Sequence, residues 1–510
     1  LPPTNRRQRQ MCIRDSNLPM PWRFGYMHSV DYGLNDGEWH TLENGDRIWR
    51  LLITSRDALT LNFIFDDFYM PEGGYIYLYN DERTDLLGAY DSSQNQESGI
   101  LGTWLVDGDT VWIEYYEPQD VAGQGRLHIV KATHGYRNAE TYRDLKGLND
   151  SGACNLDVDC SIGEDWEELK EHNKKSVGIL LSFGSGFCTG ALINNVENDG
   201  TPYFLTANHC YSNPSTWAFR FGWISPNPVC ASYTNSANGP TDLTISGASL
   251  RARDGISDFA LVEINQPIPE EWERVYAGWD RSGIFPDFTV GIHHPAGDIM
   301  KVCRDDDQPI QSVWGGGQVW EITTAGGGWE LGVTEGGSSG SPLFNPDGQI
   351  IGQLYGGGAA CSGTNDNGLY DVYGRFDISW TGGGTPDTRL SDWLDPNSSG
   401  NVTMNPYPNL VSYAYDAGVV SIDSPVSGLL TDSEVVSVTI SNFGENSISN
   451  FDVSYQLDDG TIITETFTGT IASGETAQYI FNATVDMSIL GNIYNITSFV
   501  TLSEDGDFEL

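Results

Sequence analysis

Short runs of alternating apolar and polar residues dominate this chain of 510 residues and limit it to folds built from β-strands. Segments 47–53, 75–79 and 110–115 alternate in this way, and 59 glycines and 23 prolines supply turns between such runs. The period of a helix is clearest over 163–172, where acidic residues in the first turn precede basic ones. The sequence therefore predicts an all-β protein with roughly two to four domains.

The composition argues against two classes of function. The formal net charge of −44 would repel nucleic-acid phosphates, so we expect no nucleic-acid partner. The sequence has no apolar run long enough for a transmembrane segment, so we expect none. Both features fit a soluble, exported protein.

Both ends of the chain look incomplete. Residues 1–16 carry four arginines and lack the apolar stretch of a secretion signal. We interpret 1–16 as a non-native leader, with Cys12 structurally irrelevant, that stands where a signal peptide has been lost by truncation. The C-terminal domain is expected to be truncated as well, because the chain stops soon after a predicted strand.

The remaining chain is predicted to form three domains. Residues 17–146 have the pattern of a β-sandwich and contain no catalytic constellation. Residues 147–404 contain seven of the eight cysteines and the motifs described below. Residues 405–510 include strand-like runs typical of an immunoglobulin-like β-sandwich.

The segment Glu-Gly-Gly-Ser-Ser-Gly-Ser-Pro at 335–342 places serines in a glycine-rich turn before an apolar strand. A nucleophilic serine needs an exposed hydroxyl and backbone N–H groups directed at the developing oxyanion. Such a turn alone is more often an ordinary loop. However, His209 follows an apolar run and Asp258 opens an alternating strand, so base, acid and nucleophile occur in the chymotrypsin-type order.

Further landmarks extend through nearly all of the middle domain. They lie at 151–160, 188–195, 203–210, 277–281, 292–295, 314–317, 332–342 and 352–357. With them, the middle domain resembles the bacterial lysyl endopeptidases, which are secreted serine proteases of the chymotrypsin-like superfamily. The resemblance implies a double β-barrel between the two sandwich-like domains. It also implies hydrolysis of peptide bonds on the carboxyl side of lysine through an acyl-enzyme.

The resemblance assigns roles residue by residue. His209 is the general base, Asp258 fixes its tautomer and stabilises the imidazolium, and Ser339 is the nucleophile. The backbone N–H groups of Gly337 and Ser339 form the oxyanion hole. The mechanism needs no metal and no organic cofactor, and the only expected partners of a monomeric enzyme are protein or peptide substrates.

Specificity is assigned to Asp371, because an ionised carboxylate at the bottom of a narrow pocket selects a cationic side chain. The resemblance also places Trp314, Tyr355, Gly356 and Gly357 in the substrate-binding site. Similar enzymes have a histidine at the position of Tyr355, stacked on the tryptophan that corresponds to Trp314. Arginine or mixed basic specificity is therefore one alternative function, and a catalytically silent protease-like binding scaffold is another.

The cysteines favour an oxidising compartment, because their spacings match no zinc signature. In a reducing compartment the same residues would be metal ligands or core. A Cys188–Cys210 bridge would hold the loop that carries His209. The resemblance implies Cys154–Cys361, Cys160–Cys230 and Cys188–Cys210, and it leaves Cys303 as a buried thiol.

The Lys146–Gly147 bond lies where the mature enzymes of the family begin. A lysine at this point suits a zymogen that activates itself by cutting after lysine. We therefore expect 17–146 to be a pro-domain, removed after Lys146. N-terminal sequencing of secreted material checks this expectation, and a start other than Gly147 would contradict it.

Overall fold

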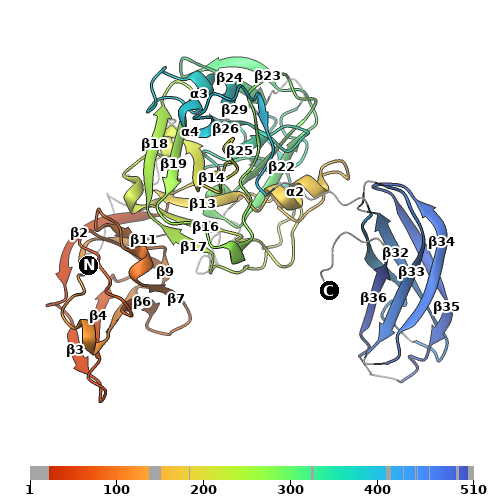
Figure 1. Cartoon of the computed structure of the whole chain (residues 1–510), viewed down its shortest axis with the longest axis horizontal. Helices are drawn as coiled ribbons and strands as arrows, with labels where there is room; N and C mark the ends of the chain where they lie inside the picture. Colours follow the sequence, from red (N-terminus) through yellow and green to blue (C-terminus); the bar gives the residue numbers. More distant parts are fainter. Residues whose placement is uncertain are drawn as a thin grey trace. The chain divides into compact units, whose positions relative to one another are not determined.

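The computed structural model describes residues 22–136, 151–182, 184–322, 327–408, 415–428, 430–442, 444, 446–458, 460–489 and 493–502. Strands dominate this part of the chain (Figure 1), so the prediction of an all-β protein is confirmed. The chain forms two compact units, 1–409 and 410–510. None of the described helices is long and apolar enough to cross a membrane.

Residues 25–135 form two antiparallel five-stranded sheets. One sheet has the order β3-β4-β10-β6-β7, with bounds Glu38–Thr41, Arg47–Thr54, Thr110–Glu117, Tyr75–Asn80 and Leu86–Tyr90. The other has the order β2-β11-β5-β8, with β9 also on β5, and bounds Gly25–Gly33, His128–Gly135, Thr60–Phe65, Leu101–Gly102 and Val106–Asp107. Every second residue of β10 is buried, as the sequence alternation requires for a strand with one face in the core.

The next part of the same unit contains two larger sheets. The first has the order β17-β16-β13-β14-β15-β19-β18, with β1 added to β14. Its bounds are Thr244–Ser246, Ala218–Phe221, Val177–Ser182, Gly186–Leu192, Tyr203–Ala207, Phe259–Ile264, Ala248–Asp254 and, for β1, Trp22–Arg23.

The second sheet has the order β12-β22-β21-β25-β26-β29-β24-β23, and β20 joins β26 to β30. Its bounds are Leu156–Asp157, Lys301–Asp305, Thr289–His293, Pro342–Phe344, Ile350–Gly357, Asp371–Arg375, Gly317–Ile322, Ile310–Trp314, Trp279–Asp280 and Thr403–Met404. A short hairpin pairs β27 (Cys361–Ser362) with β28 (Asn365–Asp366). The predicted helix at 163–172 is present as α2 (Glu167–Asn173). Two further helices, α3 (Phe376–Thr381) and α4 (Ser391–Leu394), follow β29.

The N-terminal sheets and the sheet that contains β13 and β14 share one hydrophobic core. This cluster joins Phe24, Phe63 and Trp104 of the N-terminal part to Leu181 and Phe187 of β13 and β14. The rings of Phe24 and Phe187 stack with centroids 4.7 Å apart. Residues 22–136 are therefore packed against the part of the chain that follows them, and the predicted boundary at 146/147 stays a prediction.

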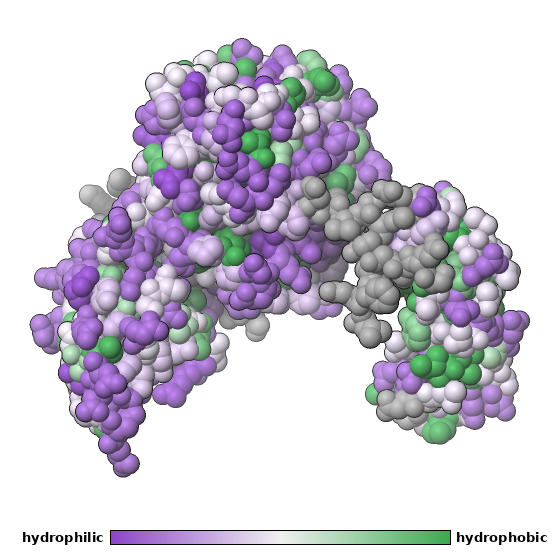
Figure 2. Space-filling view, in the orientation of Figure 1, coloured by the Kyte–Doolittle hydropathy of each residue, from purple (hydrophilic) through white to green (hydrophobic). Residues whose placement is uncertain are grey.

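The second unit contains two three-stranded sheets. The orders are β31-β32-β35 and β34-β33-β36, with bounds Ala417–Ser424, Glu434–Asn442, Thr476–Val485, Ile463–Ile471, Ile448–Leu457 and Ile496–Thr501. Val438, Val453, Tyr455 and Phe481 belong to the core between them. The architecture agrees with a sandwich, and the immunoglobulin-like assignment stays a prediction. The face of the molecule in Figure 2 is largely hydrophilic, as the large excess of acidic residues leads one to expect.

Candidate active site

His209 and Asp258 are brought together by the pairing of two adjacent strands. β15 and β19 run antiparallel, with Ala207 opposite Phe259, so the residues just beyond this end of the ladder are neighbours. His209 Nδ1 lies 2.7 Å from Asp258 Oδ2, and the His209 backbone N–H donates to Asp258 Oδ1 at 2.9 Å. The carboxylate requires the proton on Nδ1, which leaves Nε2 as the acceptor of the imidazole.

Asp258 adopts an uncommon backbone conformation for a residue with a side chain, with φ at +56°. The Asn208 backbone N–H donates to its carbonyl at 2.7 Å and helps to hold this turn. Burial raises the pKa of Asp258, while the charge and hydrogen bonds of His209 oppose this shift. The Cys188–Cys210 disulfide fixes the next residue after His209, so backbone and side chain of the histidine are both restrained.

The three serines of the turn before β25 differ in exposure. Ser338 and Ser341 are buried, whereas Ser339 is partly exposed. The Ser338 hydroxyl lies 2.7 Å from Nδ1 of buried His293, and it accepts a hydrogen bond from the Glu335 backbone N–H at 3.2 Å. The Ser338 side chain is thus engaged within the turn, while the Ser339 side chain is the one that is partly exposed.

The backbone amides of this turn differ in their partners. Ser338, Gly340 and Ser341 donate their N–H groups to backbone carbonyls, whereas Gly336, Gly337 and Ser339 donate to no other described backbone group. Gly337 has φ at +100°, a conformation that disfavours any other residue. On the opposite side of the turn, Thr189 donates its N–H to the Ser339 carbonyl at 2.8 Å and its hydroxyl to the Gly337 carbonyl at 3.0 Å.

Asp371 is the first residue of β29 and is 1% exposed. Its Oδ2 accepts hydrogen bonds from Trp329 Nε1 at 2.8 Å and from the Thr334 hydroxyl at 2.7 Å. A Cβ at Gly357 would lie 2.1 Å from Oδ1, so a side chain at this position would collide with the carboxylate. Burial raises the pKa of Asp371 to about 7, even though both hydrogen bonds favour the ionised form.

Tyr355 and Trp314, both expected in the substrate-binding site, make different aromatic contacts. The Tyr355 ring stacks on His209, with centroids 6.4 Å apart and an angle of 17° between the planes. Trp314 is 36% exposed, and its ring lies 5.6 Å from that of Tyr370. Tyr355 therefore borders the candidate base, whereas Trp314 flanks the strand end that carries Asp371.

The three disulfides of the structure join Cys154 to Cys361, Cys160 to Cys230 and Cys188 to Cys210, the pairs that the family resemblance implies. Cys303 is a buried free thiol. Cys188, His209 and Cys210 also form a compact group of potential metal ligands. Because both cysteines are in a disulfide, these residues do not provide a thiolate metal site.

The start of the middle domain is tied to the serine turn. Lys146 and Gly147 lie outside the described residues, as do 1–16 with Cys12. Beyond them, Glu335 Oε2 accepts hydrogen bonds from the Gly152 N–H at 2.7 Å and from Asn155 Nδ2 at 3.0 Å.

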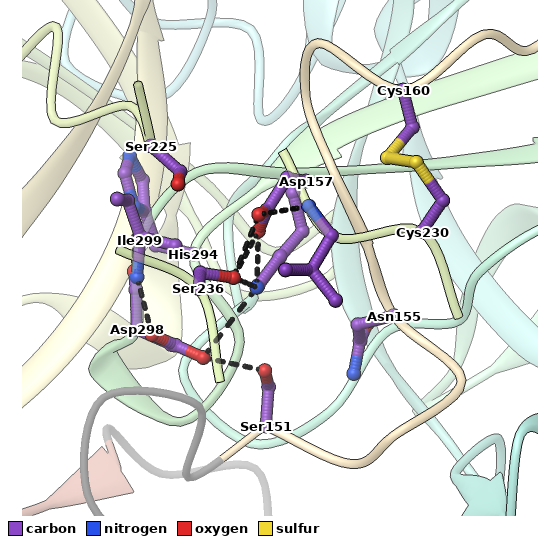
Figure 3. A network of polar contacts seen from close by, with 12 residues as sticks. Ser151, Asn155, Asp157, Cys160, Ser225, Cys230, Ser236, His294, Asp298 and Ile299 are labelled. Atoms are coloured by element: carbon purple, nitrogen blue, oxygen red, sulfur yellow. Dashed lines mark hydrogen bonds and ion pairs between the residues drawn. A yellow bond between two sulfur atoms is a disulfide. The ribbon is translucent and has the colours of Figure 1, made fainter. Parts of the chain in front are cut away.

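A buried polar network holds the same segment (Figure 3). Ser151 donates to Asp298 at 2.6 Å, and Lys301 Nζ lies 2.5 Å from Asp157 and 3.8 Å from Asp298. All four side chains are at most 5% exposed. The first described residues after the predicted cleavage point are therefore firmly attached to the interior.

Residues 148–374 match the family model described as lysyl endopeptidase, C-terminal domain. The resemblance to the lysyl endopeptidases is confirmed. A lysyl endopeptidase of Pseudomonas aeruginosa PAO1 is 28% identical over 53% of this chain and 62% of its own length. The chain thus spans about three fifths of that relative's length.

Two solved structures are similar to part of this chain. They are the inactive form of the Rv3671c protease of M. tuberculosis H37Rv and the structure of Deg5. The first is 14% identical, covering 41% of this chain and 86% of that chain, and the second is 13% identical, covering 42% and 90%. Both have a TM-score of 0.26, which is too low to support a functional argument.

Sequence reasoning missed several residues that shape this site. His293 was noted only as a landmark, although burial lowers its pKa to about 3 and keeps it as a neutral partner of Ser338. Trp329 and Thr334, the two hydrogen-bond donors to Asp371, were not identified as site residues. Nothing in their local sequence shows that they meet a strand some 40 residues further on.

Proposed function

We propose that this chain is a secreted serine endopeptidase that cuts on the carboxyl side of lysine, with His209, Asp258 and Ser339 as its triad. The family match supports peptidase activity. The observation that carries the proposal is the Asp258–His209 hydrogen bond in a domain whose serine turn has one partly exposed serine and leaves the amides of Gly337 and Ser339 without a backbone partner. A binding scaffold would need none of these features.

In the proposed reaction, Ser339 Oγ attacks the carbonyl carbon and His209 Nε2 accepts the hydroxyl proton. The N–H groups of Gly337 and Ser339 donate to the oxyanion of the tetrahedral intermediate. His209 then gives the proton to the leaving amine, and an acyl-enzyme remains. Water repeats the same steps to release the acid, while Asp258 stabilises the imidazolium formed each time.

Lysine specificity is proposed from the position of Asp371. A buried carboxylate without a cationic partner favours a substrate that brings an ammonium group to it. Thr334 and Trp329 hold one carboxylate oxygen, and the absence of a side chain at Gly357 avoids a collision with the other. We also propose that the substrate contacts Trp314, Tyr355 and Gly356.

Digestion of a denatured protein, with all cleavage sites read by mass spectrometry, tests the function. We expect cuts almost only after lysine, and none with the Ser339→Ala protein prepared in parallel. Frequent cuts after arginine would still support the triad, but they would indicate specificity for basic residues in general rather than for lysine. Absence of cleavage together with failure to react with a serine-directed phosphonate would favour the scaffold.

The raised pKa of Asp371 predicts a pH dependence that is separate from His209. Binding of n-butylamine, an analogue of the lysine side chain, to the Ser339→Ala protein requires the ionised carboxylate, while the amine itself stays protonated below about pH 10. We expect its affinity to fall about tenfold per unit as the pH drops below about 7, and to level off above that value. Calorimetry between pH 5 and 9 measures this. A flat profile, or the same slope in Asp371→Asn, would refute the assignment.

Secretion and zymogen processing belong to the same proposal. The three disulfides support an oxidising, extracellular location. Cleavage after Lys146 would separate 17–146 from an enzyme that begins at Gly147. The ties from Ser151, Gly152 and Asn155 to the interior would then keep the new N-terminal segment beside the serine turn.

A further inference from the structure

A group of three carboxylates lies outside the candidate active site. Asp305, the last residue of β22, lies together with Asp307 and Glu330, and one oxygen from each is within 4.8 Å of the other two. Two hydrogen bonds order the group, from the Asp307 N–H to Asp305 Oδ1 at 3.0 Å and from the Asp306 N–H to Glu330 Oε2 at 2.8 Å. Three carboxyl groups are thus held close together.

Asp305 is the unusual member of this group. Its side chain is 1% exposed, and its Oδ2 has no hydrogen-bond partner in the described structure. A buried carboxylate oxygen without a donor or cation is strongly disfavoured. The guanidinium of the preceding residue, Arg304, is engaged elsewhere, because its Nε donates to Asp306 at 2.5 Å and its other nitrogens donate to Asp165 at 2.7 and 2.9 Å.

We propose that Asp305, Asp307 and Glu330 bind a calcium ion. Calcium takes six to eight oxygen ligands at about 2.3–2.6 Å, so atoms on one ion lie at most about 5 Å apart, as these carboxylate oxygens do. Asp307 and Glu330 are exposed, which leaves room for water molecules to complete the coordination. Magnesium is less suitable, because it demands a regular octahedron at about 2.1 Å and gives up its water reluctantly.

The site would connect two segments that support the Asp371 pocket. Glu330 stands between Trp329, which donates to Asp371, and Leu331, which exchanges two backbone hydrogen bonds with Arg304. An ion shared by Glu330 and the 305–307 turn therefore fixes the segment that continues to Thr334. The calcium site does not depend on the proposed peptidase activity, and the experiment below does not use it.

Terbium luminescence tests the proposal on the full chain carrying Ser339→Ala, which prevents self-digestion. Tb³⁺ replaces Ca²⁺ at oxygen sites, and Trp329, adjacent to Glu330 in the chain, is a donor for its sensitised emission. We expect saturable emission that Ca²⁺ abolishes with a dissociation constant of about 10⁻⁴–10⁻³ M or tighter, and much weaker competition by Mg²⁺. Millimolar Ca²⁺ is also expected to raise the Tm of the EDTA-treated protein.

Variants of exposed side chains separate the site from general charge effects. Glu330→Gln and Asp307→Asn should each weaken Ca²⁺ at least about tenfold, because each removes a charged ligand. Asp306→Asn removes one charge from the same turn, but its side chain pairs with Arg304, so we expect less than about a threefold change. Equal losses of Ca²⁺ affinity in all three variants would overturn the proposal. Terbium emission that does not saturate would also overturn it, as would the absence of competition by 10 mM Ca²⁺ in the protein with all three carboxylates intact. Thermal unfolding of each variant verifies that it is folded.

Discussion

Ser339→Ala is expected to lower kcat on a lysine ester by a factor on the order of 10⁶, with KM changed far less. In the proposed mechanism the hydroxyl of Ser339, whose side chain is partly exposed, forms the acyl-enzyme. Removal of the nucleophile leaves only substrate binding and the oxyanion amides, which accelerate hydrolysis modestly. Steady-state rates measured with active-site titration of the unmodified enzyme give the ratio.

Ser338→Ala is the matched control in the same turn. It removes the hydroxyl that contacts His293 and accepts the Glu335 N–H, but it leaves the proposed nucleophile intact. We expect a loss well below that of Ser339→Ala, because Ser338 would position the turn without touching substrate. If Ser338→Ala were the more damaging change at equal folded fraction, the assignment of the nucleophile would be wrong.

Asp371→Asn is expected to lower kcat/KM for lysine substrates by about two to three and a half orders of magnitude. The basis is a cost of about 3–5 kcal/mol for leaving one member of a buried ion pair, here the substrate ammonium, without its partner. Asp366→Asn is a suitable comparison, since Asp366 lies near enough to influence the charge of Asp371 but its Oδ2 is bonded to the Gly368 N–H. Its effect should remain within about tenfold.

Stability distinguishes a lost pocket charge from a damaged fold. The pKa of Asp371 is raised from 3.8 to about 7 by burial, so ionisation destabilises the free folded protein. This destabilisation is absent below pH 3.8, grows through the interval and is complete above about pH 7. Asp371→Asn removes it, so at pH 8 the variant should be no less stable than the parent chain. A variant that lost both activity and stability would favour a structural role.

The sequence predicted those parts of the site that are encoded locally. His209, Asp258 and the serine turn each stand at the end of a strand, in a short motif whose residue types have few other uses together. The all-β class followed from alternation, which β10 reproduces residue by residue. These features depend on residues that are close together in the sequence, so they can be recognised from the sequence alone.

Contacts between distant segments could not be predicted in this way. Trp329 and Thr334 lie in the segment between β24 and β25 and donate to Asp371 at the start of β29, a contact that no single segment specifies. Asp305 and Glu330 lie 25 residues apart in the sequence, so acidic residues at both places gave no sign of a shared site. Likewise, an apolar residue such as Phe187 reveals that it will be buried, but not that the N-terminal domain will cover it.

Because the N-terminal sheets and β14 share one core, cleavage after Lys146 alone would not release the N-terminal domain. Hydrolysis after Lys146 would change the connectivity of the chain but leave Phe24 packed on Phe187 and β1 paired with β14. Trp22 of β1 would also remain beside Gly336, where a methyl group would meet its ring at 3.0 Å. The immediate product is thus a non-covalent complex of two polypeptides, and its dissociation, rather than the cut, would set when the face beside the serine turn becomes accessible.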